Sequence, residues 1–138
     1  MILGLKYYDD LGYLSKEIRM NNIDSLIPKY IQLSIEHREN IQNGNYKNAN
    51  KAYRRLRTIY RKLEENKGLA IPFLQYLLKE ENASVRLWAA SHALGLNVLT
   101  NDAEKVLSEI VETDKTTMLG FSAEMTLSQW KKNGYLLF

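Results

Sequence analysis

The sequence predicts an all-α fold of about five to six helices arranged in antiparallel pairs. Apolar residues recur at spacings of three and four along most of the chain, which is the spacing of one face of an α-helix. No stretch alternates apolar and polar residues for long enough to indicate a strand. The helical stretches are joined by short turns, and short links favour antiparallel neighbours.

Length and composition limit the class of protein. The 138 residues suit one domain, 1–138, and 45% hydrophobic with 25% charged residues is a balance typical of globular proteins. The chain has no cysteine, which excludes disulfides, Cys-based zinc sites, iron–sulfur clusters and thiol catalysis. We find neither a secretory signal nor a run of about 18 uncharged apolar residues, so we expect a cytoplasmic protein without a membrane span.

The first helical segments differ in clarity. Residues 5–20 carry apolar residues three or four apart but also contain glycines, so residues 1–22 are interpreted as a peripheral N-terminal segment. Asp24 is predicted to cap a helix that runs to about Asn43. Pro28 then falls in the first turn, where its missing N–H costs little.

The stretch from Tyr46 to Glu65 has the clearest amphipathic pattern. Its apolar stripe repeats at spacings of three and four and is predicted to face the core: Tyr46, Ala49, Tyr53, Leu56, Tyr60 and Leu63. The remaining faces carry cations in two groups, Arg54, Arg57 and Arg61 on one face and Lys47, Lys51, Arg55 and Lys62 on another. We predict that these seven residues bind a partner.

Two central helices are expected next. The run Leu69–Leu78 is apolar nearly all round, which predicts a central helix covered on several sides, with Pro72 in its first turn. Asn82 or Ser84 is predicted to cap a following helix, Val85–Leu96, whose alanines allow a neighbouring helix to approach closely.

The last two helices are predicted from their caps. Asn101 begins a pattern that resembles a capping box, ahead of a helix ending near Thr113. Asp114 is predicted to cap a final helix through Trp130, which ends at Gly134 in the left-handed conformation. The four apolar residues that follow are expected to pack back on the core.

Charge is distributed unevenly. The whole chain carries +3, but between Gly44 and Lys67 eight cations against two carboxylates give +6, and between Asn101 and Asp114 one cation against five carboxylates gives −4. A basic helix suits an acidic protein partner, which is the first hypothesis. Nucleic-acid binding by residues 46–65 is the alternative, weakened by the small overall charge and by the acidic segment, which would repel a duplex.

The chemistry-bearing residues do not form a catalytic constellation. His37 and His92 each lie on an apolar stripe, and Ser91 points about 100° away from His92 on a helix. Glu36 and Glu39 lie near His37 in sequence, but only surface charge groups them. With no His-Glu-x-x-His and no phosphate-binding glycine loop either, the sequence predicts no enzyme, no metal site and no cofactor.

From Leu69 to Leu96 the chain resembles a HEAT-type repeat: an apolar first helix, a polar turn, and Val85-Arg86 followed by small residues. The resemblance implies a right-handed HEAT-like stack in which Arg86 joins successive helix pairs through a carboxylate or carbonyl at a turn. The candidate partners of Arg86 are Glu80, Glu81 and Asp114. Trp88 and Trp130 are interpreted as structural core anchors, and Arg86 is interpreted as a structural residue.

Three blocks of sequence carry a more specific resemblance. They are Asn50 with Tyr60–Leu63, Val85–Leu94, and Phe121–Leu127 with Trp130, and together they span roughly Ser25 to Trp130. In these blocks the chain resembles a family of small bacterial helical proteins known only as a domain of unknown function. Some members are encoded beside polymorphic toxin genes and are regarded as immunity proteins. The resemblance therefore implies a protein that binds and occludes a cognate toxin domain.

Overall fold

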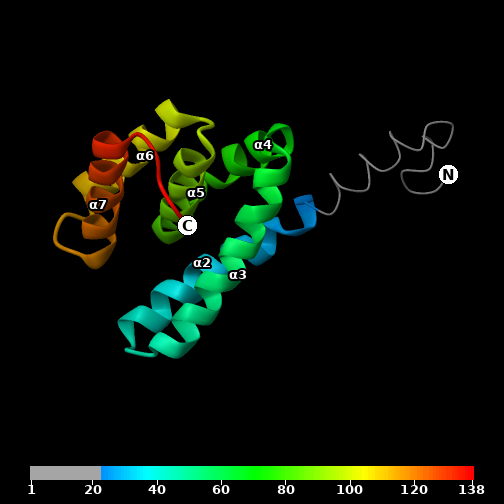
Figure 1. Ribbon diagram of the computed structural model, residues 1–138. Coiled ribbons are helices and arrows are strands. Elements are labelled where there is room, and N and C mark those ends of the chain that lie inside the picture. The colour runs from blue at the N-terminus through cyan, green and yellow to red at the C-terminus, as the bar shows by residue number, and fades with distance from the viewer. Residues whose placement is uncertain (1–22) are drawn as a thin grey trace, which may run out of the picture.

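The computed structural model describes residues 23–138, so the predicted peripheral segment 1–22 lies outside the described residues (Figure 1). Six helices follow in order: α2 (Ile27–Gln42), α3 (Tyr46–Glu65), α4 (Lys67–Leu77), α5 (Ala83–Leu96), α6 (Thr100–Thr113) and α7 (Met118–Asn133). No strand occurs between residues 23 and 138. The predicted all-α fold is confirmed.

The helices pack in neighbouring pairs, α2 with α3, α5 with α6, and α6 with α7. Helix α5 also packs against α2, α4 and α7. Figure 1 shows the α2–α3 hairpin as an arm on one side of α5, with α6 and α7 on another side. The right-handed, HEAT-like sense of the stack stays a prediction.

Helix α5 occupies the centre of the fold, and the prediction that the preceding helix is central was wrong. Nine of the fourteen residues of α5 are buried, and Ala89, Ala90 and Ala93 are completely inaccessible. In α4, by contrast, Ile71 is 39% and Tyr76 is 55% exposed. Within residues 23–138, neighbouring helices cover only one side of α4, so its apolar residues do not all find partners there.

Several helix starts differ from the predicted caps. Helix α2 begins after Leu26 and has no side-chain cap, and Asp24 lies ahead of it. The N-cap of α6 is Leu99, two residues ahead of the predicted cap Asn101, so the Asn101 capping box does not form. Helix α7 is capped by Thr117, which accepts a hydrogen bond from the amide of Gly120, rather than by Asp114.

Other local predictions are confirmed. Asn82 caps α5 by accepting hydrogen bonds from the amides of Ser84 and Val85, and Gly134 ends α7 with a φ of 76°. Pro28 lies in the first turn of α2. Pro72, however, lies inside α4, because that helix begins at Lys67, ahead of the predicted start.

The tyrosine stripe and the C-terminal tail were both predicted to pack on the core, and only part of each is buried. Tyr60 is 3% exposed, whereas Tyr46 is 62% exposed at the free end of the hairpin. Phe138 packs between Tyr60 and His92, with ring centroids 4.8 Å and 4.9 Å away. Leu137, in the same tail, is 86% exposed.

Candidate functional site

The cations of α3 form one continuous basic face. At about 100° per residue they cover the side of the helix opposite its buried residues. The buried residues are Ala49, Ala52, Leu56, Ile59, Tyr60 and Leu63. All seven predicted partner-binding residues are exposed and make up the basic face: Lys47, Lys51, Arg54, Arg55, Arg57, Arg61 and Lys62. The two predicted groups are adjacent parts of this arc.

Only one member of the basic face is neutralised within the described residues. Arg61 forms an ion pair with Glu64 at 3.1 Å and donates a second hydrogen bond, also 3.1 Å, to the main-chain oxygen of Phe138. The other six cations form no ion pair with residues 23–138. The basic face therefore carries uncompensated positive charge into solvent.

Arg86 and Trp130, two of the three residues predicted to be structural, lie at different places in the fold. Arg86 donates a 3.5 Å hydrogen bond to the carbonyl of Glu81, while its Nε is buried without a partner in the part of the chain described. It forms no ion pair with a carboxylate of residues 23–138. The indole N–H of Trp130 donates to Glu104 at 3.1 Å, which joins α7 to α6.

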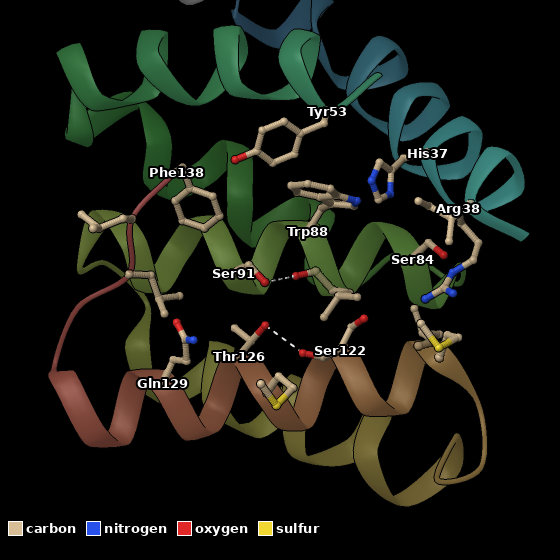
Figure 2. A pocket seen from close by; sticks show the side chains of 17 residues that line it. His37, Arg38, Tyr53, Ser84, Trp88, Ser91, Ser122, Thr126, Gln129 and Phe138 are labelled. Atoms are coloured by element: carbon tan, nitrogen blue, oxygen red, sulfur yellow. Dashed lines mark hydrogen bonds between the residues drawn. The ribbon is translucent and has the colours of Figure 1, made fainter. Parts of the chain in front are cut away.

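A pocket of about 500 Å³ opens over α5, a feature that the sequence did not predict (Figure 2). Helix α5 contributes Ser84, Trp88 and Ser91, α2 and α3 contribute one wall, and α7 contributes the other. Apolar side chains dominate the rest of the lining, which includes Ile41, Leu87, Met118, Leu119, Met125, Leu136 and Leu137. We call this feature the groove.

Trp88 is a wall of the groove as well as a packing residue. Its ring lies 5.2 Å from that of His37 at 90°, 5.8 Å from that of Tyr53, and 5.5 Å from that of His92. The side chain is half-buried, so one part of it contacts the core and another faces the groove.

Among the described residues that line the groove, Arg38 has the one side chain that is charged at neutral pH. Burial and the positive charge of Arg38 lower the pKa of His37 from 6.5, so that imidazole is neutral at pH 7. Burial also lowers the pKa of Arg38, and the carboxylate of Asp114 opposes this shift. The Arg38 guanidinium forms no ion pair within residues 23–138. Figure 2 shows it at one end of the groove, with Phe138 at the other.

Hydroxyl groups line the groove but are partly occupied by their own helices. Ser91 donates to the carbonyl of Leu87 at 2.8 Å, and Thr126 donates to that of Ser122 at 2.9 Å. Their oxygens keep acceptor capacity, whereas Ser84 and Ser122 have no side-chain hydrogen bond to another described residue. The groove thus combines apolar walls with a few polar atoms, which is the usual lining of a small-molecule site.

His92 lies beneath the groove, sealed from it. It is fully buried, and its Nδ1 shares a 2.7 Å hydrogen bond with the hydroxyl of Tyr30. Burial lowers the pKa of His92 to about 3 and raises that of Tyr30 well above 10. Both groups are therefore neutral at physiological pH. Among the described residues no cluster of three His, Asp or Glu side chains is placed to hold a metal ion.

Comparison with protein families gives a match over the region that contains the basic face and most of the groove. Residues 24–130 match the family described as Domain of unknown function (DUF2019). The chain belongs to this family. The resemblance inferred over residues 25–130 is thereby confirmed to the level of a domain of unknown function. The DUF2019 region includes the basic face and all of the groove except the tail residues 136–138.

No curated protein and no solved structure matches this DUF2019 chain. Of the helices in residues 23–138, none has the length and apolar character needed to cross a bilayer.

The sequence pattern indicated the basic face but not the groove. The basic face could be found because its residues belong to a single helix with a regular period. The groove draws residues from four helices and the tail, and Arg38 stands alone among apolar and neutral side chains. A single arginine within a helix carries no recognisable pattern.

Proposed function

We propose that this DUF2019 protein is a protein-binding module, an immunity protein that binds and occludes a cognate bacterial toxin domain through the basic face of α3. The observation that supports it is the set of six exposed cations on one helix without ion-pair partners among residues 23–138. A surface of this kind attracts an acidic partner over distance and raises the rate of encounter.

The geometry of the arm suits this role. A helix of 20 residues is about 30 Å long, which is comparable with the width of a standard protein–protein contact of about 800 Å² per partner. The end of the α2–α3 hairpin that holds the turn at residues 43–45 projects beyond the other helices, so a partner can reach that end without displacing them (Figure 1). Occlusion would then follow from the bulk of this chain on the surface of the toxin domain, and it needs no catalytic residue in this chain.

The test is binding to the protein encoded beside this one, measured by calorimetry and by association kinetics at two salt concentrations. The decisive variant reverses three cations that have no ion-pair partner in the described chain: Lys51→Glu, Arg54→Glu and Arg57→Glu. We expect the association rate to fall about tenfold or more. The matched control, with the same change in net charge, reverses Lys105, Lys131 and Lys132 on α6 and α7. Equal loss in both variants would refute the assignment of the basic face.

Nucleic-acid binding by residues 46–65 is the alternative, because a continuous stripe of cations can also contact several phosphates. A titration with duplex DNA at about 50 mM salt separates the two proposals, since phosphate contacts make binding strongest at low salt. Saturable binding that weakens steeply with salt and is lost in the three-residue α3 variant would favour nucleic acid. No detectable binding at this salt concentration would remove the alternative.

A further inference from the structure

We propose that the groove over α5 is a binding site for a small amphipathic anion, a molecule with an apolar chain that ends in a carboxylate. None of the seven cations of the basic face lines the groove, so this site is separate from the proposed partner surface. Three features of the groove support this site: its volume, its lining, and the position of Arg38, the one charged side chain among its described lining residues.

The volume and the lining favour a small apolar ligand. The cavity of about 500 Å³ falls within the range of about 300–1,000 Å³ that is typical of small-molecule sites. Most of the lining comes from helices, where main-chain groups beyond the first turn are already hydrogen-bonded along the helix, so these walls contact a ligand mainly through side chains. Those side chains are largely aliphatic, aromatic and thioether groups, which bind an apolar chain without requiring hydrogen bonds from it.

The charge favours an anion. Arg38 is half-buried and without an ion-pair partner in residues 23–138, and its guanidinium reaches into the end of the groove near Ser84 (Figure 2). A guanidinium presents several N–H donors in a planar fork, which matches a carboxylate. Asp114 is close enough to influence Arg38, but its carboxylate instead accepts a hydrogen bond from Thr113 at 3.0 Å. An incoming carboxylate would therefore meet a free set of donors.

The two ends of the groove set the orientation of the ligand. Arg38 lies at one end and Phe138 at the other, so the carboxylate binds beside Arg38 while the apolar chain runs along Trp88 toward the tail. Ser84 and Ser91 are seven residues apart on α5, which places them about 10 Å apart along the helix. This length suits a medium-chain fatty acid, and decanoate is the appropriate probe.

Trp88 provides a direct reporter of occupancy. The chain has two tryptophans, so a Trp130→Phe variant retains Trp88 as its single indole. Decanoate, at concentrations below its self-association, should change Trp88 emission saturably, and calorimetry on the full wild-type chain should give the same dissociation constant. Decyltrimethylammonium, which carries the same chain with the opposite charge, is the matched ligand control and should bind at least about tenfold more weakly.

Two substitutions with opposite expected signs test the position of the anion. Arg38→Gln should weaken decanoate binding about tenfold or more, because the charge-assisted hydrogen bonds are lost. Asp114→Asn should strengthen it, because a nearby negative charge is removed while the amide oxygen can still accept from Thr113. Arg54→Gln removes a cation from the basic face instead and should leave the affinity unchanged.

Ser122→Phe tests the groove without altering charge and serves if Arg38→Gln fails to fold. A ring at residue 122 would occupy the space between α7 and α5, so decanoate binding should be lost while the circular dichroism spectrum stays helical. The proposal is overturned if decanoate causes no saturable change. It is equally overturned if decyltrimethylammonium binds as well, if a folded Arg38→Gln or Ser122→Phe variant binds unchanged, or if Arg54→Gln weakens binding as much as Arg38→Gln does.

Discussion

Helix α3 buries six of its twenty residues along one side, whereas α5 buries nine of fourteen on nearly every side. The exposed side of α3 carries cations, whereas α5 contributes the half-buried Leu87 and Trp88 and the buried Ser84 and Ser91 to the groove. The comparison separates two roles. Changes in α5 should alter stability because its side chains contact several helices, while changes on the basic face should alter binding and leave stability nearly unchanged.

The largest effect is expected from opening a cavity in α5. Leu94 is 1% exposed within the core, and Leu94→Ala should lower the free energy of unfolding by about 2–5 kcal/mol. The matched change on the basic face, Lys51→Ala, should stay within about 0.5 kcal/mol. Urea unfolding followed by circular dichroism measures both. A small loss for Leu94→Ala, close to that of Lys51→Ala, would contradict the assignment of α5 as the central helix.

A close contact between α5 and the tail should give the next effect. A Cβ added at Gly95 would lie 2.6 Å from a ring carbon of Phe138 and 2.7 Å from the Tyr60 hydroxyl. Overpacking should cost about 1–3 kcal/mol and the higher helix propensity of alanine should offset about 1 kcal/mol of it, so Gly95→Ala should destabilise the protein by up to about 2 kcal/mol. The same substitution made in a Phe138→Ala background should cost less, because one of the clashing groups is gone. Equal costs in both backgrounds would show that the tail does not occupy this position.

Burial of His92 in α5 should make stability depend on pH. The pKa of this imidazole is about 3 in the folded protein and about 6.5 when unfolded, so between these values the unfolded chain binds more protons. Stability should therefore fall as the pH drops, by about 2 kcal/mol between pH 7 and pH 5. Unfolding of the wild-type chain at a series of pH values measures this loss.

Two histidine variants show which group causes the loss. His37, whose pKa is also lowered, acts in the same direction, but it is only half-buried. His37→Gln should therefore keep most of the pH dependence, and His92→Gln should remove most of it. The reverse result would mean that His92 is accessible to protons in the folded state.

The smallest expected effect on stability comes from the residues that cap the N-termini of α5 and α3. Asn82 accepts hydrogen bonds of 2.9 Å and 3.3 Å at the start of α5, while Asn45 accepts one exposed bond of 3.4 Å at the start of α3. Asn82→Ala should cost about 1 kcal/mol, and Asn45→Ala should lie at the low end for a capping residue, about 0.5 kcal/mol. Thermal unfolding of the two variants side by side is sufficient. A larger loss from Asn45→Ala would indicate that the α3 arm contributes more to stability than its packing suggests.

Local sequence signals were reliable where a single residue or a single apolar period decided where a helix begins or ends. Helix α3 was predicted with the bounds Tyr46–Glu65 that the structure shows, since a regular apolar stripe runs its full length. The Asn82 cap and the stop at Gly134 were likewise predicted. At the Asn82 cap and at Gly134, one residue had a strong conformational preference for that position.

Predictions failed where several neighbouring residues could fill the same role. Asp24, Asn101 and Asp114 were each expected to cap a helix, yet α2, α6 and α7 begin elsewhere. Polar residues lie near every one of these starts, and a cap contributes only about 1 kcal/mol. Packing of the helix against its neighbours outweighs that difference and selects the first residue.

The sequence by itself determined that the chain is helical, where most of its helices lie, and that α3 has a basic face, because each of these properties follows from spacings within one helix. Tertiary structure decided that α5 rather than α4 is central, that Arg38 faces a groove, and that Phe138 packs beside Gly95. Burial depends on which surfaces meet. An apolar side chain carries the same local pattern whether a neighbour covers it, as at Phe73, or leaves it open, as at Tyr76.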